Sequence, residues 1–310
     1  MWMALAAAAA WAGSGPWVVG EGQGSVYLGG EAQRLTRLAI TVDGDRQVID
    51  VGEGLSALGI KAIGSVGLTP HVELEATLPF WRVQANRPDD ELCGALGLGA
   101  CRTTTSVGVL ALRGKGLLLD EVYGAPLSFA LGAEVRSGDL TSGTRERITN
   151  VGEGGLDTGL FASVGRSGAL GGGSYAGYVE VLGRYRFPLT RAYPDNRGNG
   201  IAPGSELQGT ADLLLGPGRR FSVGPIVGAL WRPWGLDWGE LDLGDRDRLG
   251  ALRVLNAQVG ATAVVRGPGD LAASLTVLRT VAAVNNPTDT LSISAGVQTL
   301  LRTRERDRDE

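Results

Sequence analysis

The chain has 310 residues, of which 50 are Gly and 13 are Pro, yet 43% are hydrophobic and the formal net charge is only −4. This apolar share excludes a disordered chain, and the glycines keep no three-residue period, which excludes collagen. A mildly acidic pI near 5.3 gives no reason to expect a nucleic-acid partner. After the first fifteen residues no apolar run approaches the ~18 residues of a membrane-spanning helix, so a helical membrane bundle is excluded.

The N-terminal residues 1–12 read MWMALAAAAAWA, an apolar stretch with the A-x-A ending of a secretory signal but without its positively charged start. We interpret them as a signal-peptide remnant; the alternative is an Ala-rich helix packed on the domain. Residues 13–24 are then expected to form a periplasmic N-terminal segment. At the other end, residues 303–310 are nearly all charged and are expected to form a solvated periplasmic tail.

The only two cysteines, Cys93 and Cys101, enclose a short Gly-containing stretch, which predicts a loop closed by a disulfide in an oxidising compartment. Two unrelated thiols are the alternative. His71 is the only histidine, so we expect no zinc or other metal site. No nucleophile elbow or phosphate-binding loop occurs, so we expect neither an enzyme nor a cofactor.

In chain order, apolar and polar residues alternate with a period of two, as in a half-buried strand. In residues 72–78, for example, Val72, Leu74, Ala76 and Leu78 alternate with Glu73, Glu75 and Thr77. Such segments are longer than the ~5–6 residues common in soluble proteins and close to the ~9–11 that cross a bilayer at a tilt. The predicted strands are 25–35, 55–67, 71–80, 104–114, 127–137, 156–166, 174–187, 205–215, 221–232, 253–266, 271–281 and 290–302.

The connections between these segments alternate between two classes. Short ones fall at 68–70, 115–126, 167–173, 216–220 and 267–270, and longer, polar ones at 36–54, 81–103, 138–155, 188–204, 233–252 and, more briefly, 282–289. Turns on one rim and loops on the other are typical of outer-membrane barrels. The sequence therefore predicts an all-β fold over residues 25–302: a single antiparallel up-and-down transmembrane β-barrel of about 12 strands.

The alternation assigns an inner and an outer face to each strand. Unpaired charge is too costly for a dry core, so the charged face should line a wet lumen and set its selectivity, or its charges should pair across a narrow lumen. The residues predicted to line the lumen are Glu31, Lys61, Glu73, Glu75, Glu134, Glu180, Arg184, Arg186, Glu206, Asp212, Arg232 and Arg266. The inward glycines Gly59, Gly132, Gly260 and Gly296 should leave room beside them or mark kinks. The residues predicted to form aromatic girdles at the two rims are Phe80, Trp81, Tyr175, Tyr185, Phe187, Phe221, Trp231 and Trp234.

Several stretches resemble the outer-membrane family of the meta-pathway of phenol degradation, a set of transporter barrels. They are residues 67–70 (GLTP) running into 71–81 (HVELEATLPFW), residues 126–138 (PLSFALGAEVRSG), residues 150–157 (NVGEGGLD) and the following strand pair to Phe187. The resemblance covers most of residues 55–200. It implies an outer-membrane barrel and uptake of small, apolar or aromatic compounds, and it supplies no catalytic residues.

Together these observations predict a channel or transporter in the outer membrane of a Gram-negative bacterium. Its expected partners are outer-membrane lipid, a small-molecule solute and the barrel-assembly machinery. One alternative is a closed structural or adhesion barrel that acts through its extracellular loops. The other is a soluble, exported β-sandwich.

Overall fold

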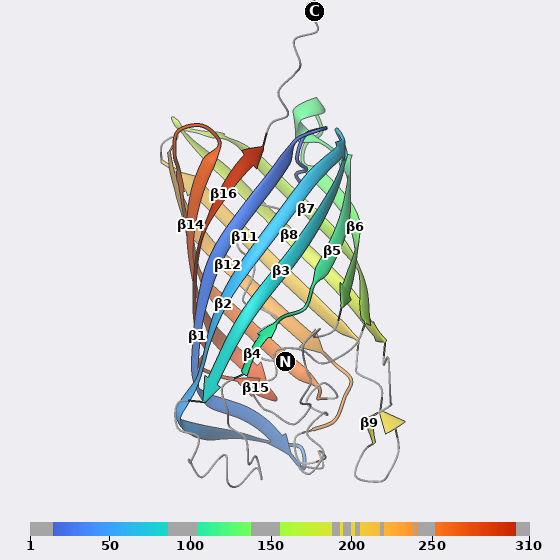
Figure 1. Cartoon of the computed structure of the whole chain (residues 1–310), viewed down its shortest axis with the longest axis vertical. Helices are drawn as coiled ribbons and strands as arrows, with labels where there is room; N and C mark the ends of the chain where they lie inside the picture. The colour runs from blue at the N-terminus through green and yellow to red at the C-terminus, as the bar shows by residue number, and fades with distance from the viewer. Residues whose placement is uncertain are drawn as a thin grey trace, which may run out of the picture.

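Twelve long strands form one antiparallel barrel, as the alternation predicted (Figure 1). The computed structural model describes residues 15–85, 104–137, 156–187, 193–194, 200–201, 205–217, 220–237, 240 and 252–301. The barrel strands are β1 (Gly24–Val42), β2 (Asp45–Thr69), β3 (Val72–Ala85), β5 (Ala111–Leu119), β6 (Ser128–Ser137), β7 (Leu156–Leu170), β8 (Gly173–Phe187), β11 (Glu206–Gly216), β12 (Phe221–Arg232), β13 (Val254–Arg266), β14 (Leu271–Val284) and β16 (Leu291–Leu301).

The barrel closes because β1 pairs with β2 on one side and with β16 on the other. Closure gives every strand two neighbours, which is what a sheet needs in hydrocarbon, where no water can satisfy a free edge. Five short elements complete the described chain: β4 (Thr104–Val107), which pairs with β3 beyond β5, the β9 (Tyr193–Pro194) and β10 (Gly200–Ile201) ladder, β15 (Asn286–Pro287), and the 3-10 turn η1 (Glu121–Tyr123). In the part of the chain that the structure describes, no helix reaches the length and apolarity of a membrane span.

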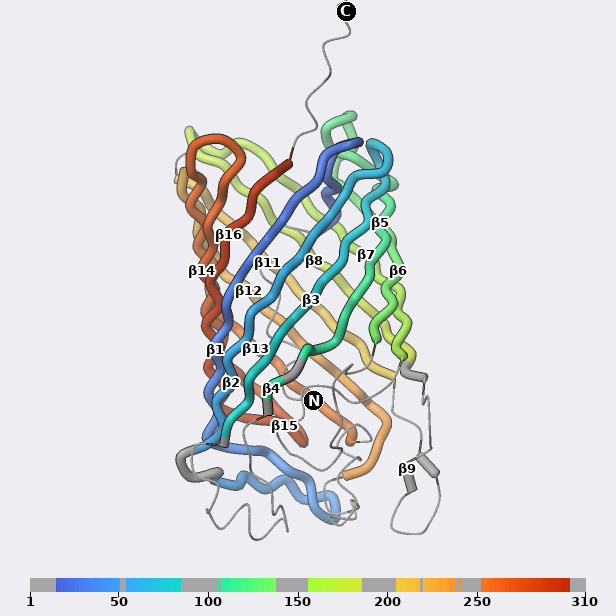
Figure 2. Tube along the Cα trace, in the orientation of Figure 1, coloured from blue at the N-terminus to red at the C-terminus, as the bar shows by residue number. Residues whose placement is uncertain are grey.

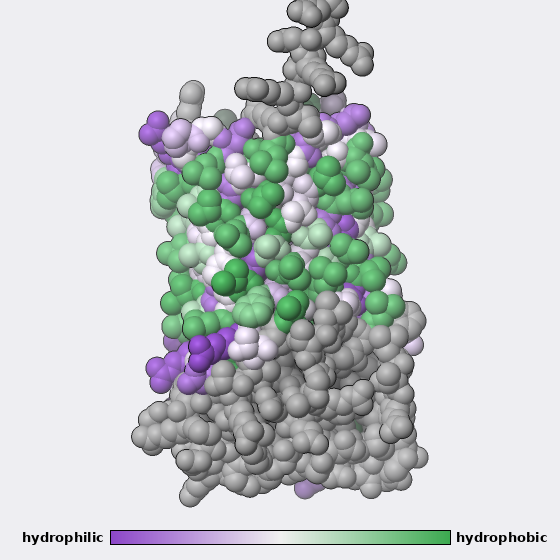
Figure 3. Space-filling model, viewed as in Figure 1, coloured by the Kyte–Doolittle hydropathy of each residue, from purple (hydrophilic) through white to green (hydrophobic). Residues whose placement is uncertain are grey.

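Side chains alternate between the two faces of the wall along each strand. In β1, Tyr27 is 2% exposed on the inner face, whereas its neighbour Leu28 is 58% exposed on the outer face. The space-filling view shows apolar side chains across the visible face of the outer wall, with more polar residues toward its two ends (Figure 3). An apolar exterior and a polar interior are the reverse of a soluble barrel.

The connection predicted at 36–54 is wrong, because these residues continue β1 and β2. The two strands pair as far as Val42 and Asp45 and are joined by Asp43 and Gly44, both with positive φ, as in a type I′ hairpin turn. A register shift near Leu35 and the positive φ of Gly54 mark a bulge. A side chain at Gly54 would meet the Leu35 carbonyl, so glycine is needed there.

Beyond the bulge the hairpin bends across the loop-side end of the barrel (Figure 2). Leu38 and Ile40 are buried there, and the Thr41 amide donates to Asn285 Oδ1 at 2.7 Å. The Asp289 carboxylate accepts from the amides of Thr36 and Arg37 at 3.0 and 2.9 Å. The extension is therefore fixed to the β14–β16 connection and forms part of the loop-side cover.

Candidate functional site: the barrel lumen

The lumen carries most of the charged side chains that alternation assigned to it. Glu31, Glu73, Glu75, Glu134, Arg184, Glu206, Asp212 and Arg232 are all less than 10% exposed. Lys61, Glu180 and Arg266 are partly buried on the same face. The side chain of Arg186 lies outside the described part of the structure, although its backbone pairs with Asp157. Their role in selectivity remains a prediction.

The strand registers connect many of these charges into one row across the wall, which we call the charge row. It consists of Ser25, Ser65, Glu75, Arg113, Glu134, Gly159, Arg184, Glu206 and Arg232. Each of these residues lies beside the next on the neighbouring strand, so acid and base alternate from Glu75 onward. The row begins near the first residue of β1 and ends at the last residue of β12. Because barrel strands are tilted, such a row climbs from the turn rim to the loop rim.

Ion pairs hold the charge row together. Arg184 bridges Glu134 and Glu206 with two contacts of 2.6 Å, and Arg232 adds a 3.1 Å contact to Glu206. Arg113 lies 3.5 Å from Glu134 and 2.6 Å from Glu180. Arg184 reaches Glu134 across Gly159, where an added Cβ would lie 3.0 Å from the Arg184 Cγ. The missing side chain at Gly159 therefore lets the row continue between β6 and β8.

Three cations of this network are not among the residues that the sequence predicted to line the lumen. Arg113 and Lys115 lie on the inner face of β5, and Lys115 pairs with Glu73 at 3.4 Å. Arg136 lies 3.7 Å from Glu206. Arg113, Lys115 and Leu117 are spaced two residues apart, so the period of two could have placed all three on one face of a strand. The predicted strand stopped at residue 114 and assigned Lys115 to a turn.

The placement of Trp81 in the rim girdle is wrong. Phe80 is 46% exposed on the outer face, so Trp81, the next residue, points inward and is 6% exposed. Its ring lies over Gly59, its cross-strand partner, where an added Cβ would come within 2.4 Å of the ring. Phe161 lies over Gly132 in the same way, so Gly59 and Gly132 leave room for aromatic rings. Gly260 differs, because its Cβ would meet the Val277 carbonyl.

The exposure of the remaining predicted girdle residues is as follows. Tyr185, Phe221, Trp231 and Trp234 are exposed, and Tyr175 is partly buried. The side chain of Phe187 lies outside the described part.

The inner faces of β13, β14 and β16 contrast with the charge row because they carry mainly uncharged polar groups. They include Asn256, Gln258, Thr262, Thr276, Thr280 and Ser292, all 5% exposed or less. Some of these groups pair with each other, as the hydroxyls of Thr262 and Thr276 do at 3.0 Å. We call this part of the lumen the uncharged wall.

Residues 15–23 of the N-terminal segment lie against the inner wall near the turn rim. Lys115 Nζ donates to the carbonyls of Gly15 and Trp17 at 3.3 and 2.5 Å, and Glu73 accepts from the Val19 amide at 2.6 Å. The Trp17 indole donates to Glu121 at 3.1 Å. The segment therefore narrows the lumen and uses the Lys115–Glu73 pair as its anchor.

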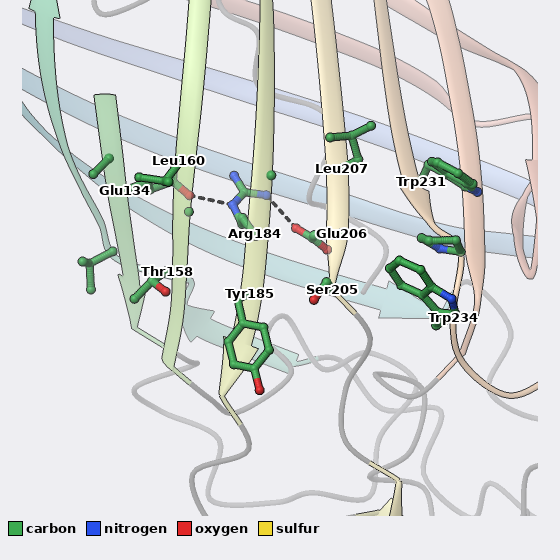
Figure 4. Close-up of a pocket in the computed structure, with 15 residues that line it drawn as sticks. Glu134, Thr158, Leu160, Arg184, Tyr185, Ser205, Glu206, Leu207, Trp231 and Trp234 are labelled. Atoms are coloured by element: carbon green, nitrogen blue, oxygen red, sulfur yellow. Dashed lines mark hydrogen bonds and ion pairs between the residues drawn. The ribbon is translucent and has the colours of Figure 1, made fainter. Parts of the chain in front are cut away.

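An apolar pocket of about 750 Å³ opens on the outer face of the wall, behind the charge row (Figure 4). Gly183 leaves a gap in the outer surface, because its cross-strand neighbours Leu160 and Leu207 carry side chains and it does not. Tyr185, Trp231 and Trp234 complete its wall. Figure 4 shows Arg184 between Glu134 and Glu206, beside the apolar residues of the pocket. The apolar outer surface and the inner ion pairs are therefore separated here by the thickness of a single sheet.

Three predictions concern residues outside the described ranges. They are the Cys93–Cys101 disulfide, the signal-peptide remnant at 1–12 and the charged tail at 303–310, and each stays a prediction. Within the described ranges, no group of three or more His, Cys, Asp or Glu side chains is arranged to hold a metal ion.

Comparisons with known proteins place this fold. No family model and no curated protein matches the chain. Among solved structures, an outer membrane channel from Pseudomonas putida F1 aligns with a TM-score of 0.61 at 17% identity, covering 94% of this chain and 99% of that one. The CymD monoaromatic hydrocarbon channel aligns over 92% of this chain and 89% of its own at 10% identity, with a TM-score of 0.41. The chain therefore has the fold of an outer-membrane barrel.

Proposed function

We propose that this protein is an outer-membrane channel for small molecules. The observation that carries the proposal is the lumen itself: a closed wall of membrane-spanning strands with apolar side chains outside and polar side chains inside. Plugged barrels also carry a polar interior, so the flux measurement described below distinguishes a channel from a closed barrel.

The lumen charges nearly balance, which bears on the solute. Among the described residues, the inward acids are Glu31, Glu73, Glu75, Glu134, Asp157, Glu180, Glu206 and Asp212, and the inward bases are Lys61, Arg113, Lys115, Arg136, Arg184, Arg232 and Arg266. Because the acids and bases of the charge row are paired with each other, the lumen offers no large field of one sign to a passing ion. We therefore infer that its solutes are mainly uncharged.

The orientation follows from the two rims. We propose that the turn rim, where residues 15–23 enter the barrel, faces the periplasm, and that the loop rim with the β1–β2 extension faces outward. The bilayer lipid then contacts the apolar outer wall, and the barrel-assembly machinery inserts the chain. The resemblance to the phenol-degradation family supports small apolar or aromatic compounds as the solute class and supplies no catalytic residues.

Flux through liposomes tests the proposal. Purified protein in vesicles should allow an uncharged solute of a few carbon atoms to cross faster than empty vesicles do. Lys115→Met removes the anchor of residues 15–23 and should increase this flux. Arg266→Met, at the turn rim but away from the segment's hydrogen bonds, is the matched control. Vesicles that stay sealed with both the native protein and Lys115→Met would favour a closed barrel that acts through its loops.

A further inference from the structure

One place at the edge of the uncharged wall, on the neighbouring strand β12, has open space beside it. Gly228 lies on the inner face of β12, between the buried side chains of Ile226 and Leu230, each 1% exposed. A Cβ built on Gly228 would meet no atom within 4 Å. The other inward glycines described above lie under an aromatic ring or against a neighbouring backbone, so this gap is unlike theirs.

Polar side chains border the gap on both neighbouring strands. The register pairs Gly228 with Gln258 on β13 and with Thr210 on β11. Gln258 in turn pairs with Thr280 on β14. Since directly opposed Cβ atoms lie about 5 Å apart, these side chains surround one small volume. Its sides along β12 are apolar and its sides across the sheet are polar, with Asp212, the partner of Ile226, as the nearest charged residue on β11.

The polar border contains buried oxygen atoms without hydrogen-bond partners. They are Gln258 Oε1, Thr280 Oγ1 and Asn256 Oδ1, on residues that are 3–5% exposed. A buried polar atom without a partner is costly, and natural proteins keep few of them. The hydroxyls of Thr262 and Thr276, on the same two strands, are paired with each other. On β13 and β14 the unpartnered side-chain oxygens therefore lie close to Gly228, and on the β11 side Gln208 Nε2 and Asp212 Oδ1 also lack partners.

We propose that this niche, formed by Gly228, Ile226, Leu230, Gln258 and Thr280, binds one small uncharged molecule that carries a hydroxyl group on an apolar body. The hydroxyl donates to Gln258 Oε1 and accepts from the Thr280 hydroxyl, and the apolar body packs on Ile226 and Leu230, as in small-molecule sites with few polar groups in an apolar surface. The inference rests on the proposed channel function and names the solute class for it.

Binding to the purified protein tests the niche separately from flux. Two probes of nearly equal size are used, benzyl alcohol and ethylbenzene, which differ by a hydroxyl in place of a methyl group. Calorimetric titrations at one fixed detergent concentration compare variants against the same micelle background. Thr280→Val should weaken benzyl alcohol binding about three- to tenfold, the size of one hydrogen bond, and leave ethylbenzene unchanged. Gly228→Leu fills the gap and should abolish binding of both probes.

Two controls match these variants. Gly209→Leu makes the same change on β11 at a glycine that has open space beside it and, like Leu207 two residues before it, faces outward. Thr262→Val removes a hydroxyl that is already paired with Thr276. Both should bind benzyl alcohol as the native protein does, and heat-modifiable gel migration confirms that every variant is folded. Equal binding by Gly228→Leu and the native protein, or no loss in Thr280→Val, would overturn the niche and indicate that water fills it. Normal binding with sealed liposomes would instead overturn the channel and leave the niche in place.

Discussion

The charge row and the uncharged wall occupy the same lumen but satisfy their polar groups differently. In the charge row, Arg184 contacts two carboxylates and Glu206 accepts from two arginines at 2.6 and 3.1 Å. On the uncharged wall, Gln258 and Thr280 lie opposite each other yet leave oxygen atoms without partners. The difference teaches that ion pairs hold the charge row together, whereas neutral oxygens on β13 and β14 are left to meet a solute.

The largest effect should follow from cutting the charge row at its centre. Arg184→Met leaves Glu134 and Glu206 buried without their main partner, and removing one member of a buried ion pair costs about 3–5 kcal/mol. The temperature at which the folded band disappears in heat-modifiability gels should fall sharply. Thr276→Val on the uncharged wall is the comparison, with a much smaller decrease. Equal decreases in the two variants would contradict the distinction between the regions.

Gly159→Ala should have an intermediate effect. The new methyl group would lie 2.8 Å from Leu182 Cδ1 and 2.9 Å from the Gly183 carbonyl, and it would push Arg184 away from Glu134. Overpacking of this kind costs about 1–3 kcal/mol in unfolding free energy. Gly64→Ala, where a Cβ meets nothing within 4 Å, should change stability by no more than about 0.5 kcal/mol. Denaturant titration of both variants in the same detergent measures the difference.

Acidic pH should weaken the attachment of residues 15–23 to the inner wall of the barrel. Partial burial opposes ionisation of Glu121, but hydrogen bonds from Ser167 and from the Trp17 indole outweigh it and lower the pKa of Glu121 below its ordinary value of 4.5. A lowered pKa stabilises the folded contacts above the ordinary value, and this contribution is lost as the pH falls through the folded pKa. Proteolysis near Trp17 should therefore increase below about pH 4. In Glu121→Gln this pH dependence should disappear; an unchanged profile would refute the role of Glu121.

The smallest changes in stability are expected for two threonines of the uncharged wall, and they should differ between the two. Thr262→Val leaves the Thr276 hydroxyl without its partner and should cost about 1 kcal/mol, whereas Thr280→Val removes an atom that has no partner and should cost nothing or stabilise slightly. Thermal unfolding of the solute-free protein measures both. A larger loss in Thr280→Val than in Thr262→Val would mean that the Thr280 hydroxyl is already satisfied.

The alternation in the sequence was sufficient to predict the barrel and most of its inner charges, because parity is a local property of a strand. It failed over residues 36–54, where the consecutive apolar residues 38–40 and the polar residues 43–47 interrupt the period of two that marked the other strands. It failed at Trp81, where two adjacent aromatic residues were assigned to one face although a strand permits only one. The charge row and the gap at Gly228 could not be predicted, because they depend on the register between strands far apart in the sequence.

A planar-bilayer recording under a salt gradient tests the central claim most directly. The native protein should show stepwise conductance with a reversal potential near zero, because the acids and bases of the charge row neutralise each other. Glu180→Gln removes one inward carboxylate and should shift the potential toward anion preference. A silent membrane with folded protein, or a strong cation or anion preference in the native channel, would contradict the account.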